Sequence, residues 1–138
     1  MKWTSMIIMA SALGCSAPNA PVEATFPEAP LTTLKSDNGA LAIEIRTSPE
    51  QPPGRGISSV EYTITDQGGR PRDDLELSVV PWMPAMGHGA STKPTIEAKG
   101  EGRYVVSGVS MFMPGRWELR TAISGALQDR TTLALQIP

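Results

Sequence analysis

The stretch VEYTITDQGGRPRDDLELSVV, from Val60 to Val80, decides the fold. Apolar and polar residues alternate over 60–64, and the same period of two returns over 75–79. This alternation is typical of β-strands that bury one face and expose the other. The intervening DQGGRP has the chemistry of a turn, because Gly68 and Gly69 tolerate a positive φ. The stretch therefore predicts two short strands with a turn between them.

The same pattern predicts strands along the rest of the chain, and no segment shows convincing helical spacing. Seven strands are expected, near 41–45, 60–64, 75–79, 95–98, 103–110, 117–123 and 133–137. Thirteen glycines and thirteen prolines also favour short strands and turns. Together these features predict an all-β fold, an immunoglobulin-like or cupredoxin-like antiparallel β-sandwich of about seven strands. Tyr62 and Trp117 are its expected aromatic core anchors.

The length and charge of the chain limit what it can be. A chain of 138 residues is most simply one domain. Its formal net charge of -2 is far from the basic excess that nucleic-acid binding requires, so no nucleic-acid partner is expected. A single cysteine cannot form an internal disulfide, so the folded domain depends on its apolar core.

The first fifteen residues, MKWTSMIIMASALGC, are expected to be a lipoprotein signal peptide. Lys2 precedes an apolar stretch from Met6 to Leu13 that is too short to span a bilayer. The ending Ala12-Leu13-Gly14-Cys15 resembles a bacterial lipobox, in which the cysteine receives diacylglycerol and becomes the new N-terminus. The other interpretation is an ordinary secretory leader, cut near Ala17 or Ala20.

Lipidation of Cys15 would anchor the protein in the bacterial cell envelope, facing the periplasm. Ser16 is not the aspartate that retains lipoproteins in an inner membrane, so an outer membrane is favoured. Residues 16–38 are rich in Pro, Ala, Ser and Thr and lack periodicity, which predicts a semi-extended tether. Residues 39–138 are then the folded domain.

The predicted strand order also places the loops. Successive strands of a sandwich run from pole to pole, so alternate connections share a pole. The connections over 48–56, 82–93 and 111–115 are therefore expected to lie together, at the pole opposite the tether. This expectation depends on the weak strand near 95–98.

Two of these loops contain all the methionines outside the leader, together with the only histidine of the chain. Thioethers are soft ligands that favour Cu(I), and imidazole binds copper in either oxidation state. A three- or four-coordinate Met/His site needs no thiolate and would bind zinc poorly. The candidate copper ligands are Met83, Met86, His88, Met113 and Met111.

The same residues have a second interpretation without metal. Methionine is a flexible core filler, and Met83 or Met113 could simply cap the sandwich with Trp82 and Phe112. A lone histidine is more often structural than a ligand. Strand alternation in MFM would instead place Met111 and Met113 on one side, facing a shared pocket. On the metal-free interpretation, these loops form a docking patch for an envelope partner.

Catalysis is not expected. One histidine, with the only thiol consumed by lipidation, offers no nucleophilic triad. The carboxylate pair Asp73-Asp74 lies beside a turn and is expected to be solvated. No glycine-rich phosphate loop leads from a strand into a helix.

The stretch from Pro81 to Ser124 resembles the YtkA-like domain, which is related to FixH-type proteins. The resemblance begins in PWMPAMGHG with Met83-Pro84-x-Met86-x-His88. It continues with the Gly-x-Tyr of Gly102 and Tyr104, and then with Met-Pro-Gly-x-Trp-x-Leu over 113–119. Its extent is about Ala40 to Ile137.

This resemblance implies an exported, membrane-anchored Ig-like sandwich whose relatives are linked to copper handling and oxidase assembly. A lipid would replace the transmembrane helix of FixH. A copper-receiving envelope protein is the partner that the resemblance implies.

Overall fold

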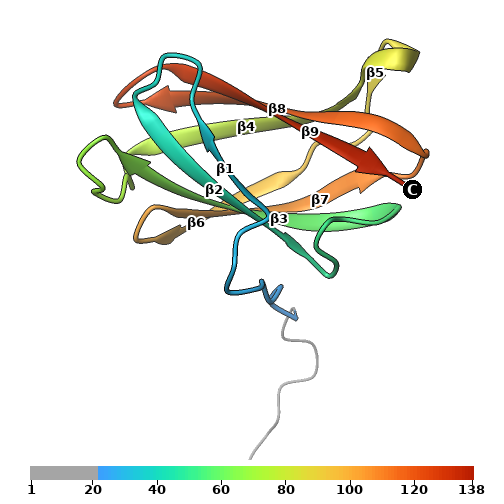
Figure 1. Ribbon diagram of the computed structural model, residues 1–138, viewed down its shortest axis with the longest axis horizontal. Helices are drawn as coiled ribbons and strands as arrows, with labels where there is room; N and C mark the ends of the chain where they lie inside the picture. The colour runs from blue at the N-terminus through green and yellow to red at the C-terminus, as the bar shows by residue number, and fades with distance from the viewer. Residues whose placement is uncertain (1–21) are drawn as a thin grey trace, which may run out of the picture.

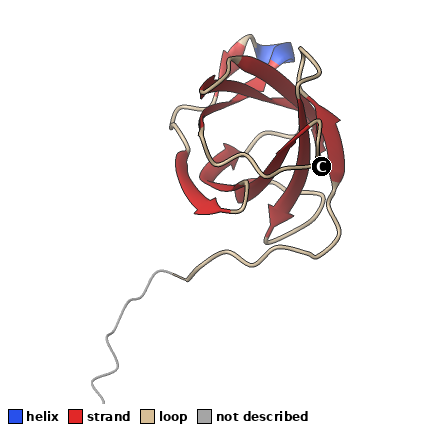
Figure 2. Cartoon of the chain, turned by 90° about the vertical axis from the view of Figure 1, so that its left-hand side faces the viewer, coloured by secondary structure: helices blue, strands red, loops and turns tan. Residues whose placement is uncertain are grey.

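The computed structural model describes residues 22–138 as two antiparallel sheets packed face to face (Figure 1). One sheet has the strand order β1-β2-β3-β7-β6, and the other has the order β5-β4-β8-β9. The strands are β1 (Thr32–Lys35), β2 (Leu41–Ser48), β3 (Gly56–Asp66), β4 (Leu75–Met83), β5 (His88–Gly89), β6 (Thr95–Gly100), β7 (Arg103–Met111), β8 (Gly115–Gly125) and β9 (Asp129–Ile137). A 3-10 turn, η1, spans Pro84–Met86. Figure 2 shows the strands of both sheets enclosing a common interior.

The all-β sandwich predicted from the sequence is confirmed. All seven expected strands are present, and β1 and β5 are added to them. The weak strand expected near 95–98 is β6. Within residues 22–138, no helix has the length and apolar character needed to cross a membrane.

Alternating side chains of both sheets fill the core, as the period of two requires. Tyr62 and Trp117 are both buried in it, as expected. The Tyr62 hydroxyl lies 2.8 Å from the Thr121 hydroxyl, so this hydrogen bond joins the two sheets through the interior. The remaining large, fully buried side chains are Leu41, Ile43, Ile45, Ile64, Met111, Leu119 and Ile137.

The turn within the opening stretch carries the chain from one sheet to the other, because β3 and β4 belong to different sheets. Asp66 shapes it: its Oδ1 accepts hydrogen bonds from the backbone N–H groups of Gly68 and Arg70. The Tyr104 hydroxyl then donates to the Arg72 carbonyl at 2.7 Å and fixes the crossing segment. The local alternation and turn chemistry were sufficient to predict the strands, but not which strands pair.

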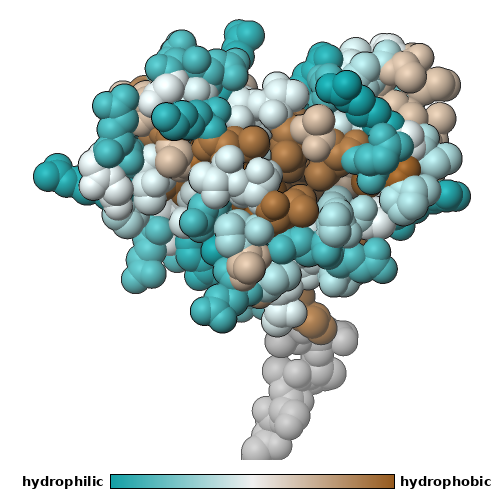
Figure 3. Space-filling model, viewed as in Figure 1, coloured by the Kyte–Doolittle hydropathy of each residue, from teal (hydrophilic) through white to brown (hydrophobic). Residues whose placement is uncertain are grey.

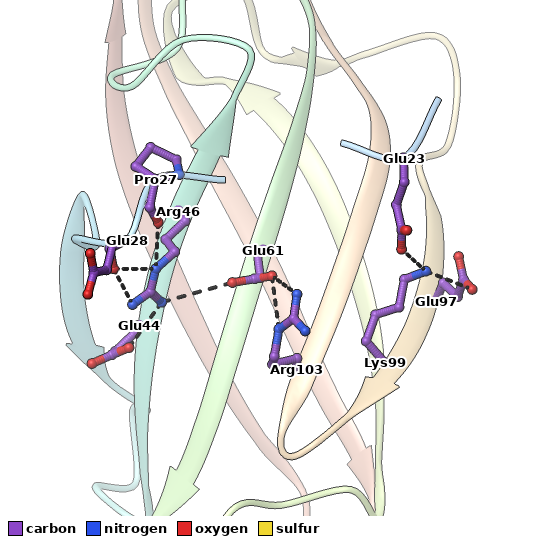
Figure 4. Close-up of polar contacts among 9 residues, drawn as sticks. All are labelled: Glu23, Pro27, Glu28, Glu44, Arg46, Glu61, Glu97, Lys99 and Arg103. Carbon is purple, nitrogen blue, oxygen red and sulfur yellow. Dashed lines mark hydrogen bonds and ion pairs between the residues drawn. The ribbon is translucent and has the colours of Figure 1, made fainter. Parts of the chain in front are cut away.

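The segment predicted as a tether is partly structured. Residues 32–35 form β1, which pairs with β2, and the preceding residues cross the outer face of that sheet (Figure 4). Arg46 donates to the carbonyls of Pro27 and Glu28 at 2.9–3.1 Å. The Lys99 ammonium lies 2.8 Å from the Glu23 carboxylate. We call residues 22–31 the strap.

The strap explains a buried charge on the outer face of the sheet. Glu61 is only 5% exposed, and its carboxylate accepts from Arg103 at 2.6 Å and 3.1 Å. Val105, opposite Glu61 in the ladder, is also buried on this face. Because β1 and the strap lead the chain across the sheet, the described N-terminal segment leaves from this face (Figure 1). The expectation that the tether leaves from the pole opposite the candidate site was therefore wrong.

Candidate metal site

Three connections meet at one end of the sandwich, as the strand count predicted. Gly56 pairs with Met111, which joins the end of the 48–56 connection to the last residue of β7. The Met83 methyl lies so close to Gly115 that a Cβ built there would be 2.9 Å away. Figure 1 shows η1, β5 and the β7–β8 turn at this same end. We call this end the methionine pole.

The first loop is a tight hairpin between β4 and β5. Met83 and His88 are directly opposite in the ladder, so their side chains leave the same face. Gly87 closes the turn with φ of 65°, a conformation that glycine adopts without steric cost, and its N–H donates to the Met83 carbonyl at 3.1 Å. The hairpin therefore fixes the backbone around Met86 and His88.

The second loop joins β7 to β8. The Trp117 indole N–H donates to the Met113 carbonyl at 2.8 Å and holds this turn. Because β7 ends at Met111, the alternation expected through MFM does not continue. Met111 is fully buried, whereas Phe112 is 60% exposed and Met113 is 38% exposed. Met111 therefore belongs to the core, whereas Met113 lies at the surface.

The five candidate ligands divide into two groups. Met83, at 5% exposure, and Met111, at 0%, belong to the apolar core beneath the methionine pole. Met86, at 51% exposure, and His88 lie exposed on the first loop, while Met113 lies exposed on the second. The structure thus leaves three potential ligands exposed on the two loops of this end and places two sulfurs in the interior.

The two aromatic side chains expected in an apolar cap, Trp82 and Phe112, do not cover the core. Phe112 is exposed, and Trp82 lies on the outer face of its sheet, where the Arg120 guanidinium stacks 4.7 Å from the ring centroid. Of the four residues proposed for that cap, only Met83 packs as a core filler.

The His88 ring is oriented by its neighbour. Its Nδ1 lies 3.1 Å from the Gly89 carbonyl. When Nδ1 carries the proton and donates to this carbonyl, Nε2 keeps its lone pair for a metal. Imidazole nitrogen and thioether sulfur are both donor types that suit copper.

The described residues offer less support for a site that binds a harder metal ion. Among residues 22–138, no three His, Cys, Asp or Glu side chains converge as a metal site. Asp74 forms a bidentate pair with Arg72 at 2.9–3.0 Å, and this pairing lowers the pKa of the Asp74 carboxyl. Asp73 accepts a 2.7 Å hydrogen bond from the Gly102 N–H. Both carboxylates therefore serve the local structure of a turn.

A family model described as YtkA-like matches residues 37–122, which is more than half of the chain. The chain belongs to the YtkA-like family. The match includes the first loop of the methionine pole and the β7–β8 turn, but not β9. No curated protein and no solved structure matches this YtkA-like chain significantly.

Two features of the YtkA-like domain had no clear signal in the sequence. The strap lacks periodicity, and only its charges Glu23 and Glu28 could have suggested contacts with basic residues. Ile57, which is 62% exposed, adds an apolar side chain next to the methionine pole. Only its position directly after Gly56, at the end of the 48–56 connection, could have suggested this in the sequence.

Cys15, the expected lipidation site, lies outside the described residues.

Proposed function

We propose that this YtkA-like chain is an envelope lipoprotein that binds Cu(I) through Met86, His88 and Met113, for copper delivery or tolerance. The supporting observation is the exposure of these three side chains at one end of the sandwich, while the two other candidate sulfurs are buried. Exposed methionines are soft ligands that a copper ion can reach without opening the core. Met83 and Met111 form the apolar floor beneath them.

The anchor and the location belong to the same proposal. Diacylglycerol on Cys15 would hold the domain at a membrane surface facing the periplasm, in an outer membrane by preference. An oxidising compartment suits a site made of thioethers and imidazole, because neither ligand forms a disulfide. The proposed role is binding, with transfer to a copper-receiving envelope protein, and it assigns no catalytic residue.

A titration of the full chain with Cu(I), in competition with a chromophoric Cu(I) chelator, tests the proposed site. We expect Met86→Ala combined with His88→Ala to weaken copper affinity at least about tenfold, because two donors are lost. Unchanged affinity in this double variant would contradict the proposal.

Two substitutions serve as matched controls. Met83→Leu and Met111→Leu remove sulfur but keep volume, so each should cost less than about 1.5 kcal/mol of stability. We expect both to leave copper affinity unchanged. A loss of affinity in Met83→Leu alone would add that sulfur to the ligand set and would leave the pole as the copper site.

A second function is supported by the other exposed side chains. Phe112 and Ile57 are each about three-fifths exposed at the methionine pole. Exposed apolar side chains mark a docking surface where they form a contiguous patch. On this alternative, the chain is a metal-free interaction module of the envelope. Stability that does not respond to Cu(I), with partner capture that is lost in Phe112→Ser, would favour it.

A further inference from the structure

Strand β9 is a long open edge of the sandwich. It is the outermost strand of the sheet β5-β4-β8-β9. Its ladder with β8 runs without a register shift, from Gly115 opposite Ile137 to Ile123 opposite Asp129. In such a ladder, successive residues direct their backbone N–H and C=O alternately toward β8 and toward the free edge.

Arg130 shows which residues of β9 face outward. Its carbonyl accepts a 2.8 Å hydrogen bond from the Asp37 N–H, and its own N–H donates to the Asp129 carboxylate at 2.8 Å. Both groups are thus engaged away from β8. By alternation, Thr132, Ala134 and Gln136 also direct their N–H and C=O groups outward. No partner for these groups is found among residues 22–138.

The other edges of the sandwich carry features that discourage strand addition, whereas residues 131–137 of β9 lack them. Strand β6 has the charges Glu97 and Lys99, and β1 is only four residues long. Strand β4 contains Glu76 and Pro81, and β5 covers its end. Residues 131–137 of β9, TTLALQI, contain no charge, proline or glycine. Natural edge strands usually include such protection against pairing with other chains.

The two faces of β9 are also self-complementary. Leu133 and Leu135 point inward, and each is 7% exposed at the seam between the sheets. Figure 3 shows apolar side chains at the surface along this seam. Thr132, Ala134 and Gln136 form the exposed outer face. A second β9 placed antiparallel would bring leucine against leucine and neutral polar residue against neutral polar residue.

We propose that β9 pairs with β9 of a second copy of this chain, with the two-fold axis at Ala134. In this register Thr132 lies opposite the partner's Gln136, and Leu133 lies opposite the partner's Leu135. The three outward residues of each strand then exchange about six backbone hydrogen bonds. The two four-stranded sheets become one continuous sheet across the dimer.

The geometry separates the two methionine poles. The C-terminal end of β9 lies at the methionine pole, because Ile137 pairs with Gly115. Antiparallel pairing directs the two strands oppositely, so the two poles lie at opposite ends of the dimer. Each copper site is then complete within one chain, and the dimer does not depend on the proposed copper function.

Two charge variants of the full chain, sized by sedimentation velocity over a range of concentrations in a mild detergent, test the dimer. T132K/Q136K places like charges opposite each other at both pairs, and we expect its dimer dissociation constant to rise at least about 100-fold. T132K/Q136E uses the same positions but sets opposite charges across the axis. We expect it to dimerise within about tenfold of the parent.

A covalent probe tests the register. We expect Ala134→Cys to be cross-linked by a short bismaleimide, whereas Glu97→Cys on the edge of β6 remains uncross-linked. The parent chain gives the background from Cys15, its only cysteine. A parent that sediments as a monomer at every concentration overturns the proposal. So does a T132K/Q136K dimer of parental affinity, or an Ala134→Cys variant that dimerises without cross-linking.

Discussion

The methionine pole contains both buried and exposed methionines, and the two kinds lie close together in the sequence. Met83 and Met86 are three residues apart, and Met111 and Met113 are two apart. Yet the first member of each pair is at most 5% exposed, and the second is at least 38% exposed. In each case the strand ends between them: β4 ends at Met83 and β7 ends at Met111.

This difference shows how one segment can serve stability and binding together. The last inward residue of each strand seals the core, because strand alternation still governs its direction. The next methionine lies on a turn and is free of that alternation. A site made from such second methionines stands on a rigid floor, which lowers the ordering cost of binding.

The largest expected effect separates the two groups by stability. Met111→Ala should lower the free energy of unfolding by about 2–5 kcal/mol, because it leaves a cavity in a fully packed core. Met113→Ala should change it by much less, since its side chain lies partly in solvent and outside the core cluster. Chemical denaturation of both variants without copper measures the difference.

Equal stability losses in Met111→Ala and Met113→Ala would contradict the division into floor and site. In the copper titration, the exposed methionine should have the larger effect on Cu(I) affinity. We expect Met113→Ala, and not Met111→Leu, to weaken Cu(I) binding.

A second prediction concerns the interior below this floor. Burial raises the pKa of Tyr62 to about 12, although its hydrogen bond with Thr121 opposes part of the increase. The folded state therefore holds this proton more tightly than the unfolded state, whose tyrosine pKa is about 10. The stabilisation is fully present below about pH 10 and is lost as the pH rises toward 12. The loss should reach about 2–3 kcal/mol.

Denaturant unfolding of the parent chain and of Tyr62→Phe between pH 9 and 12 isolates this contribution, since other groups titrate in both. The stability of the parent should fall more steeply with pH than that of Tyr62→Phe. Parallel curves would show that the interior does not hold Tyr62 in its neutral form.

Much of the fold followed from local pattern. The alternation over 60–64 and 75–79 predicted β3 and β4, and the strand count predicted that the methionine loops share a pole. The strap and β1 could not be predicted in this way, because their order comes from contacts with Arg46 and β2 far along the sequence. Composition alone made this segment resemble a linker.

The candidate site was predicted as a set of residues but not as a geometry. The clustering of sulfur in two loops named all four methionines and His88 without distinguishing floor from surface. That distinction depends on where β4 and β7 end, and strand ends are the least certain part of any pattern. The buried Glu61 was also hidden from the sequence, because the strap and the charges of Arg46 and Arg103 explain it, and the fold alone brings these together.

The smallest predicted effect tests the contact between the two loops. Gly115 has φ of 128°, and its neighbour in space is the Met83 methyl. Gly115→Ala should cost about 1–2 kcal/mol, because this backbone conformation is strained for residues with a Cβ and because Met83 must shift. Gly68→Ala, at a turn glycine without a positive φ, is the matched control: its Cβ would lie 3.3 Å from the Asp66 carboxylate oxygen and its backbone bears no strain, so the change should cost less than Gly115→Ala.

A double variant separates the two causes. If the Met83 methyl contributes, Gly115→Ala should cost less in a Met83→Ala background than in the parent, because the contact is then gone and only the backbone strain remains. Equal costs in both backgrounds would mean that Met83 yields freely, and the floor beneath the exposed ligands would be softer than its burial suggests. A rigid floor predicts the opposite, and it also predicts that Gly115→Ala disturbs copper binding through Met113, two residues away.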